Sequence, residues 1–346
     1  DDALTSGVGT RTETLVDSSR PTPSSGDQPA TDERTLETLV WYPALVEETA
    51  AGVVADATPD PSSGPYPLDV VSHGLGGDPE NVVAVGDDWV AAGMVVAAPR
   101  FPLSRFDAPA GPDGADVVNQ PGDVSFVISE LLAASADASS PLTGLIDETS
   151  IGAAGHSTGA ITTLGVTANT CCTDERIGAA IAFAGSAAPF SGGEYAWETA
   201  PPFLVVHGTD DKVVNYAEGV GVFNDLPGPK GLLTIEGGDH GSWFGEEATG
   251  QDEVVTATTD FLLAHLTDDA DAHSRLSAGR SSPDASLVYG AEPGTTVTVP
   301  SPVAETDRAA TVDPSTGLTD GQVVTVTWDG YLPCGTVSVI QCAAGG

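Results

Sequence analysis

The spacing of apolar positions along this chain changes near residue 66. Before that point, residues 11–16 and 35–42 alternate apolar and polar side chains, which predicts an antiparallel edge hairpin ending at Pro43. After that point, short apolar runs alternate with helical patterns. Strands separated by helices at this rhythm indicate a parallel sheet that is covered by helices on both faces.

The individual elements of this sheet can be placed from the same pattern. The expected strands are residues 68–72, 94–98, 151–154, 177–184, 203–206 and 232–235, and the expected helices are residues 80–92, 123–134 and 254–266. Residues 100–119 form a long loop in this interpretation. Right-handed crossovers would bring the carboxyl ends of the strands to one edge of the sheet, where ligands bind in such folds.

The remaining chain divides by composition. We expect an α/β domain over residues 1–267, an Asp/Ser/Pro-rich linker over 268–310, and a small β-rich segment over 311–346. Within the last segment, residues 323–328 and 336–340 alternate like strands.

The most specific chemical signal is Gly155-His156-Ser157-Thr158-Gly159, which follows the apolar run 151–154 and precedes a helical run at 160–164. A G-x-S-x-G turn between a strand and a helix exposes the serine hydroxyl above the sheet edge. Glycines are needed because a side chain at either position would meet the neighbouring strand or helix. The motif predicts acyl transfer with Ser157 as the nucleophile.

A nucleophilic serine requires a base, and in this arrangement the base follows the serine and the acid in the chain. His240 lies in a Gly-rich loop directly after a predicted strand, where an exposed base is expected. His265 lies inside a predicted helix and His273 lies in the predicted linker. His207 ends a strand, where we expect it to pack beneath the acid loop.

The acid of a triad is expected on the loop after residues 203–206. Two adjacent candidates, Asp210 and Asp211, follow Gly208 on this loop. One of them would orient the imidazole of His240, and the other would cap the turn. The pattern leaves both assignments open.

An oxyanion hole needs two backbone N–H groups. The residue after the nucleophile, Thr158, is the expected source of one, and Leu75 in the loop His73-Gly-Leu-Gly-Gly77 is the expected source of the other. Trp197 and Trp243 are candidates for lining an acyl pocket, although packing in the core or in a lid would equally explain these rings. No ligand set with metal spacing and no phosphate-binding glycine loop is visible, so we expect neither a metal nor a cofactor.

The chain holds four cysteines. Cys334 and Cys342 could bridge two strands. The adjacent pair Cys171 and Cys172 is expected to remain as buried thiols, with one distant disulfide partner as the alternative.

These residues together resemble the α/β-hydrolase superfamily over residues 10–267. The closest resemblance is to its platelet-activating-factor acetylhydrolase-like branch, through Arg11-Thr-Glu-Thr-Leu-Val-Asp17, Trp41-Tyr-Pro43, the loop at His73, Asp116-Val-Val-Asn-Gln-Pro-Gly-Asp123, and the segments around Ser157, Asp211 and His240. The resemblance implies a serine ester hydrolase without cofactor. It also favours Asp211 as the acid, because the acid of related hydrolases lies three residues after the glycine.

The actinobacterial cutinase and polyester-hydrolase branch is also similar, through the segment from Trp197 into the acid loop. The chain departs from that branch at Thr158, where a methionine is usual, and no cysteine pair brackets the region after His240. The tail after Ala310 resembles the start of a neocarzinostatin-like β-sandwich, of which about a third is present. Such tails occur on secreted proteins, so the resemblance implies an extracellular protein whose signal peptide is absent from this chain.

Three functional hypotheses follow. The first is a serine carboxylesterase or lipase-like hydrolase of short to medium acyl esters. The second is a cutinase-like depolymerase of polyesters, and the third is a non-catalytic binding protein on a hydrolase scaffold. The expected partner is a small or polymeric ester, and the oligomeric state stays open.

The net charge of the chain excludes some classes of binding partner. There are 50 acidic and 11 basic residues, for a net charge of −39, which excludes the basic surface of a nucleic-acid binder. No apolar run is long enough to span a membrane. The acidic excess is explained either by solubility alone or by halophilic adaptation, in which salt screens the self-repulsion.

Halophilic adaptation makes a direct prediction. Because screening weakens repulsion among the carboxylates, molar NaCl is expected to raise the midpoint of thermal unfolding above its value in low salt. Differential scanning calorimetry in both buffers measures this shift. A midpoint that is unchanged or lower in molar NaCl would contradict the hypothesis.

Overall fold

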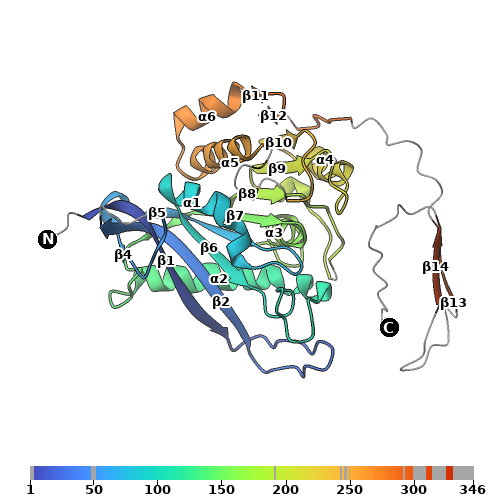
Figure 1. Cartoon of the computed structure of the whole chain (residues 1–346), viewed down its shortest axis with the longest axis horizontal. Helices are drawn as coiled ribbons and strands as arrows, with labels where there is room; N and C mark the ends of the chain where they lie inside the picture. The colour runs from blue at the N-terminus through green and yellow to red at the C-terminus, as the bar shows by residue number, and fades with distance from the viewer. Residues whose placement is uncertain are drawn as a thin grey trace. The chain divides into compact units, whose positions relative to one another are not determined.

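The computed structural model describes residues 4–47, 52–190, 192–241, 244, 248, 250–290, 293–298, 309–313 and 325–329. The chain forms two compact units, Asp1–Val297 and Thr298–Gly346. The first unit is a large sheet with helices on both faces, and it holds all the candidate site residues that the structure describes (Figure 1).

The strands and helices of the first unit alternate along most of the chain. Its strands are β1 (Leu4–Asp17), β2 (Arg34–Glu47), β3 (Val54–Ala55), β4 (Thr58–Pro59), β5 (Tyr66–Ser72), β6 (Val95–Arg100), β7 (Ile146–His156), β8 (Ile177–Phe183), β9 (Phe203–Gly208), β10 (Lys230–Ile235), β11 (Arg280–Ser281) and β12 (Ala285–Tyr289). Its α-helices are α1 (Val83–Ala91), α2 (Gln120–Ala136), α3 (Thr158–Ala168), α4 (Tyr216–Asp225), α5 (Gln251–Leu266) and α6 (Ala270–Ser277). Short 3₁₀ turns are η1 (Pro61–Ser63), η2 (Pro79–Val82), η3 (Gly114–Val118) and η4 (Trp197–Thr199).

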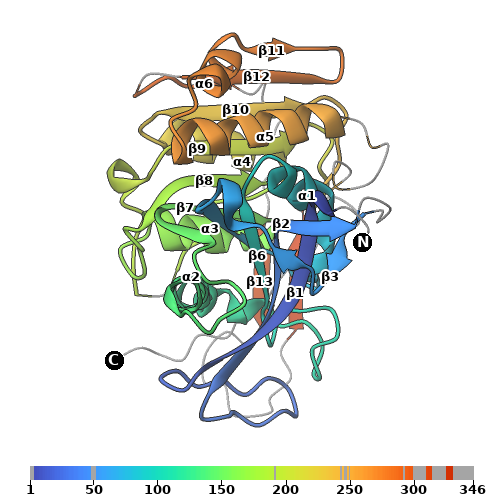
Figure 2. The same ribbon diagram turned by 90° about the vertical axis from the view of Figure 1, so that its left-hand side faces the viewer.

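The sheet is parallel in its centre and antiparallel at its ends. Its order is β11-β12-β10-β9-β8-β7-β5-β6-β2-β1-β3, with β4 beside β2. Figure 2 shows the half of the sheet from β11 to β7 side by side. The neighbours from β10 to β6 are all parallel, whereas β2 and β12 pair with them antiparallel. Every residue of β5, β9 and β10 is buried, which explains why these strands are nearly continuous apolar runs in the sequence.

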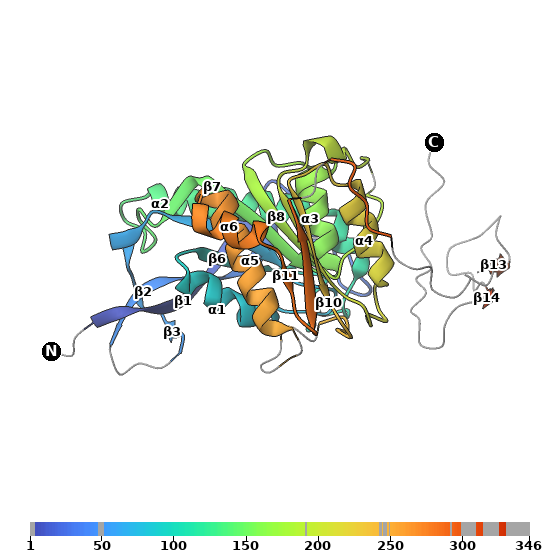
Figure 3. The same ribbon diagram turned by 90° about the horizontal axis from the view of Figure 1, so that it is seen from above.

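Helices cover the two faces of the sheet in separate groups. Helices α1, α5 and α6 lie on one face, and α2, α3 and α4 lie on the other (Figure 3). Trp89, Phe261 and Leu276 anchor the first group to one core cluster, whereas Val127 and Leu131 of α2 pack into a second cluster on the opposite face. The sheet is therefore buried on both sides, as its sequence pattern requires.

The N-terminal hairpin is longer than the sequence predicts. β1 and β2 pair from Leu4↔Glu47 to Asp17↔Arg34, and Pro43 lies within β2 instead of ending it. Pro43 pairs in register with Val8, and its carbonyl accepts a hydrogen bond from Asp60 N–H. A proline lacks only the donor, so a strand can continue through it where its carbonyl still finds a partner.

Part of the expected linker at residues 268–310 is instead ordered secondary structure. α6, β11 and β12 occupy this stretch, and β12 adds to the sheet antiparallel to β10. Leu276 and Leu287 are buried in the same core cluster as α5. The Asp/Ser-rich composition concealed these short elements because few of their residues face the core.

The second unit contains a strand pair among its described residues. β13 (Ala309–Asp313) pairs antiparallel with β14 (Thr325–Asp329), close to the predicted strand at 323–328. The predicted strand at 336–340 lies outside the described residues, as do Cys334 and Cys342.

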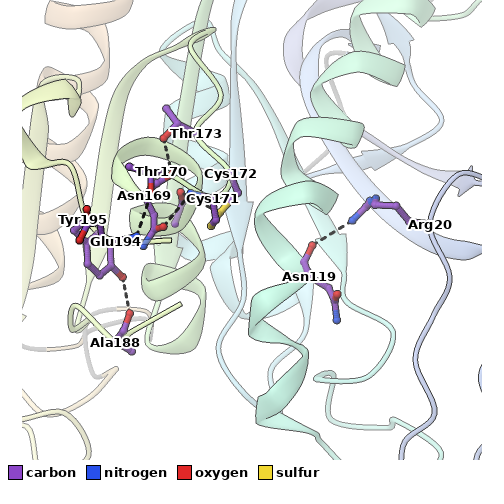
Figure 4. Close-up of a disulfide and its surroundings, with 11 residues drawn as sticks. Arg20, Asn119, Asn169, Thr170, Cys171, Cys172, Thr173, Ala188, Glu194 and Tyr195 are labelled. Carbon is purple, nitrogen blue, oxygen red and sulfur yellow. Dashed lines mark hydrogen bonds between the residues drawn. A yellow bond between two sulfur atoms is a disulfide. The ribbon is translucent and has the colours of Figure 1, made fainter. Parts of the chain in front are cut away.

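The prediction of free thiols at Cys171 and Cys172 was wrong, because the two form a disulfide with each other (Figure 4). The turn after α3 brings them together. The side-chain oxygen of Asn169 accepts from Cys171 N–H at 3.2 Å, and its backbone carbonyl accepts from Cys172 N–H at 3.1 Å and from the Thr173 hydroxyl at 2.8 Å. These contacts are set by the folded turn and cannot be read from the spacing of the cysteines.

A buried charge cluster fastens the start of α2 to the sheet. Arg34 on β2 donates to both carboxylate oxygens of Asp123 at 2.7 Å and to Asp116 at 2.8 Å, and all three side chains are buried. Arg20 adds an ion pair to Asp123 at 2.9 Å and donates to the Asn119 carbonyl (Figure 4). Buried charges that are paired with one another in this way fix geometry more than they add stability.

A second buried charge, Asp69 on β5, is placed differently. It is fully buried, and neither carboxylate oxygen has a hydrogen-bond partner among the described residues. Burial raises the pKa of Asp69 to about 8, because the charged form loses its hydration. Asp69 is therefore protonated in the folded chain at neutral pH.

This raised pKa predicts a pH-dependent stability. The folded state keeps the proton that the unfolded state releases near pH 4, so stability is full below pH 4 and falls until pH reaches about 8. The loss is up to ~1.4 kcal/mol per pH unit. In Asp69→Asn this component is absent, so urea unfolding at pH 5 and pH 7.5 should show the wild type losing stability relative to the variant. An equal difference at both pH values would contradict the assignment.

Candidate active site

Ser157 lies at a sharp turn between β7 and α3. Its φ of 56° and ψ of −118° are unusual for a residue with a side chain, which matches the strained turn that the motif predicts. A Cβ on Gly155 would lie 2.1 Å from Gly159 O, and a Cβ on Gly159 would lie 2.0 Å from Ser72 O. Both glycines are therefore required by close backbone approach, as the sequence predicts.

The turn opens onto a cavity of about 510 Å³ at the carboxyl edge of the sheet. Ser157 and His240 both line it, so the candidate nucleophile and the candidate base share one space. The other lining residues are His73, Gly74, Leu75, Gly76, Gly77, Glu80, His156, Gly241 and Phe244. A direct Ser157–His240 hydrogen bond is not among the contacts of the described residues, and such bonds often form only when substrate binds.

Asp211 is the carboxylate that meets His240. Its Oδ2 lies 2.8 Å from His240 Nδ1, so the ring donates from Nδ1 and leaves Nε2 as the acceptor. Asp211 is buried, whereas the side chain of His240 is 20% exposed. The neighbouring candidate Asp210 is exposed and pairs with Lys212 at 2.9 Å. The geometry thus distinguishes two acids that the local pattern left open, and it brings to His240 the one, Asp211, that the family resemblance favours.

The surroundings of Asp211 keep it ionised. Burial alone would raise its pKa, but hydrogen bonds from His207, His240 and the backbone N–H groups of Val213 and Val214 outweigh this and hold the pKa well below its usual range. His207 Nε2 lies 3.3 Å from Asp211 Oδ2 and 2.9 Å from Val214 O. The buried His207 therefore packs beneath the acid loop, as expected, and also bonds to it.

His265 and His273, the other two histidines that follow Ser157, lie away from this cavity. His265 Nε2 is 2.7 Å from the Tyr289 hydroxyl, and its ring packs against His273 with centroids 5.2 Å apart. His273 belongs to α6. Of the histidines that follow Ser157, only His240 lines the described cavity.

His156 also lines the cavity, although the sequence motif predicts no role for it. Its Nε2 donates to the backbone carbonyl of His240 at 2.6 Å, and its ring contacts the rings of His240 and Phe244. Burial lowers the pKa of His156 to about 4, so the ring is neutral at physiological pH. It braces the loop that carries His240. The sequence feature that could have pointed to His156 is its position directly before Ser157 in the serine motif.

The glycine loop at 73–77 stands beside the serine. A Cβ on Gly74 would lie 3.2 Å from Ser157 Cβ, which shows how closely the loop approaches the nucleophile. Gly76 N–H donates to Ser104 O at 2.7 Å, and Gly77 N–H donates to Gly74 O at 2.9 Å. In the described part of the chain, the N–H groups of Leu75 and Thr158 donate to no protein acceptor. These are the two groups that the sequence assigns to an oxyanion hole.

The two tryptophans proposed for the acyl pocket have different outcomes. The structure does not bring Trp197 to the cavity, because its ring stacks on Tyr195 at 4.6 Å and 8°. Trp243 lies outside the described residues. Phe244 and Leu75 supply the apolar lining instead, and Glu80 adds one carboxylate.

The described residues hold neither a metal-binding cluster nor a membrane-spanning helix. No three His, Cys, Asp or Glu side chains among them are grouped so that they could hold a metal ion. No helix among them combines the length and apolarity needed to cross a bilayer.

Comparison with known proteins yields a structural likeness only. The sequence matches no protein-family model and no curated protein. The structure is similar to that of the ferulic acid esterase from Streptomyces cinnamoneus, with a TM-score of 0.59 over 76% of this chain and 91% of that chain. The two sequences are 23% identical, so the likeness concerns the fold. It confirms the predicted α/β class with a central sheet between layers of helices.

Proposed function

We propose that this chain is a serine-dependent carboxylic ester hydrolase that acts through an acyl-enzyme. The observation that carries the proposal is the Asp211–His240 hydrogen bond of 2.8 Å beside Ser157 in one cavity, with Ser157 held in a strained turn. A serine, a histidine and a buried carboxylate in this relation form the arrangement that activates a hydroxyl for attack on a carbonyl.

The proposed reaction has two halves, acylation of Ser157 and hydrolysis of the acyl-enzyme, and His240 transfers a proton in both. Ser157 Oγ attacks the ester carbonyl while His240 Nε2 accepts its proton, and the imidazolium then gives that proton to the departing alcohol. Water repeats the sequence on the acyl-enzyme and releases the acid product. Asp211 stays ionised throughout, because its hydrogen bonds hold its pKa low, and it stabilises the imidazolium from the Nδ1 side.

The negative oxygen of the tetrahedral intermediate needs donors that are already in place. We assign this role to the N–H groups of Leu75 and Thr158, which flank Ser157 from the glycine loop and from the start of α3. Such donors favour the transition state over the ground state, so they raise the rate more than the affinity.

The cavity and the structural likeness support an ester of modest size. About 510 Å³ with Phe244 and Leu75 on its wall suits a short or medium acyl group, and the similar structure is named as a ferulic acid esterase. A polymeric ester is a second candidate, because Leu75 and Phe106 on neighbouring loops are 50% and 61% exposed. The disulfide at Cys171 supports our proposal of an extracellular location, since disulfides persist in oxidising compartments.

The proposal predicts a specific pattern among four proteins. Hydrolysis of p-nitrophenyl butyrate is expected for the wild type, at least about a thousandfold lower kcat/KM for Ser157→Ala, and a loss of similar order for Asp211→Asn. Asp210→Asn is the matched control and should stay within about twofold, because Asp210 is exposed and pairs only with Lys212 among the described residues. For all four proteins, kcat and kcat/KM are obtained from initial rates at saturating and at limiting ester concentration.

Two results would contradict the proposal. Equal activity of Ser157→Ala and the wild type would show that Ser157 is not the nucleophile. A folded wild type that is inert towards p-nitrophenyl esters of every chain length, in low and in high salt, would instead favour a binding protein on this scaffold.

A further inference from the structure

The two proposed oxyanion donors come from distant parts of the chain. Leu75 belongs to the loop after β5, and Thr158 opens α3. Both N–H groups must point at one oxygen at 2.7–3.1 Å to stabilise it. Something must therefore hold the glycine loop and the start of α3 at a fixed separation.

A buried hydrogen-bond chain begins at the glycine loop. Gly76, which follows Leu75, donates to the backbone carbonyl of Ser104 at 2.7 Å. The hydroxyl of Ser104 accepts a hydrogen bond from Gln120 Nε2 at 2.8 Å. Ser104 is 1% exposed and Gln120 is fully buried, so water does not compete for these bonds.

The chain continues from Gln120 into α3. Gln120 Oε1 accepts a hydrogen bond from the hydroxyl of Thr162, which is also fully buried. The same hydroxyl oxygen lies 3.2 Å from the carbonyl oxygen of Thr158, one turn earlier in α3. The side chain of Gln120 thus connects Ser104, which binds the glycine loop, with Thr162, which contacts Thr158 at the start of α3.

Gln120 is itself held from both sides. Asp116 precedes it and Asp123 follows it, and Arg34 binds both carboxylates at 2.7–2.8 Å. Its amide holds a donor nitrogen and an acceptor oxygen in a fixed plane, and the chain uses both atoms. An apolar side chain of the same length would keep the volume and lose both links.

We infer that Gln120 is a positioning residue that sets the separation of the Leu75 and Thr158 N–H groups. The inference rests on the proposed function. It assigns no contact with substrate to Gln120, which does not line the described cavity. Loosening the two donors would weaken binding of the tetrahedral oxyanion and leave binding of the neutral ester unchanged.

The test compares Gln120→Met with a matched structural control. Thr258→Val removes the buried acceptor of Trp89 Nε1, a bond of 3.1 Å on the other face of the sheet. For both variants, kcat and KM on p-nitrophenyl butyrate are measured with the melting temperature and with Ki for an alkyl trifluoromethyl ketone. That ketone forms a tetrahedral adduct whose oxygen occupies the oxyanion hole.

Gln120→Met is expected to lower kcat about 10- to 100-fold, to keep KM within about twofold, and to raise Ki by the same factor as the loss in kcat/KM. Thr258→Val is expected to lower the melting temperature and to leave kcat and Ki unchanged. Gln120→Glu can accept from both hydroxyls, so it is expected to recover part of the rate. Ser104→Ala, which removes one hydroxyl, should repeat the pattern and serves as the test if Gln120→Met does not fold.

The inference is overturned if Gln120→Met and Ser104→Ala keep kcat and Ki within twofold of an active wild type. It is also overturned if Thr258→Val loses as much kcat at an equal loss of melting temperature, since the effect would then be general destabilisation. In both cases the proposed function stands. A wild type without esterase activity contradicts the proposed function itself, and the inference falls with it.

Discussion

The site depends on one close backbone approach, where the start of α3 passes the end of β5. Gly159 lies so near Ser72 that a Cβ would come within 2.0 Å of its carbonyl oxygen. This contact turns the chain sharply at Ser157 and forces the positive φ of that residue. Because Ser72 leads directly into the glycine loop, the same contact sets Ser157 beside Gly74 and Leu75. Nucleophile and oxyanion loop are therefore one structural unit.

A second unit brings the base to this turn. β9 and β10 are parallel neighbours, so the loops after them, which carry Asp211 and His240, leave the sheet side by side. His207 beneath Asp211, and His156 bonded to the His240 carbonyl, fix these loops from below and from the serine side. The buried carboxylate keeps its charge because four hydrogen bonds compensate the lost hydration.

Much of this arrangement is predictable from local sequence. The apolar runs predict the central strands because those strands are buried on both faces, and the serine motif predicts the turn because only glycine fits there. What local reasoning missed depends on distant partners. The local pattern leaves Asp210 and Asp211 open and the family resemblance favours Asp211, which is the carboxylate that faces His240. The Cys171–Cys172 disulfide depends on the turn that Asn169 holds. Trp197 stacks on Tyr195, a neighbour in a loop whose course no periodicity describes.

The central claim is that Ser157 is an activated nucleophile, and covalent trapping tests it most directly. Diisopropyl fluorophosphate reacts with an activated serine as Oγ forms a bond to phosphorus and fluoride departs. Intact-mass measurement followed by peptide mapping should find one adduct per chain, on Ser157, that is absent when the protein is unfolded before treatment and absent in His240→Ala. A folded protein that takes up no label, or that is labelled at another residue with Ser157 unmodified, would contradict the account.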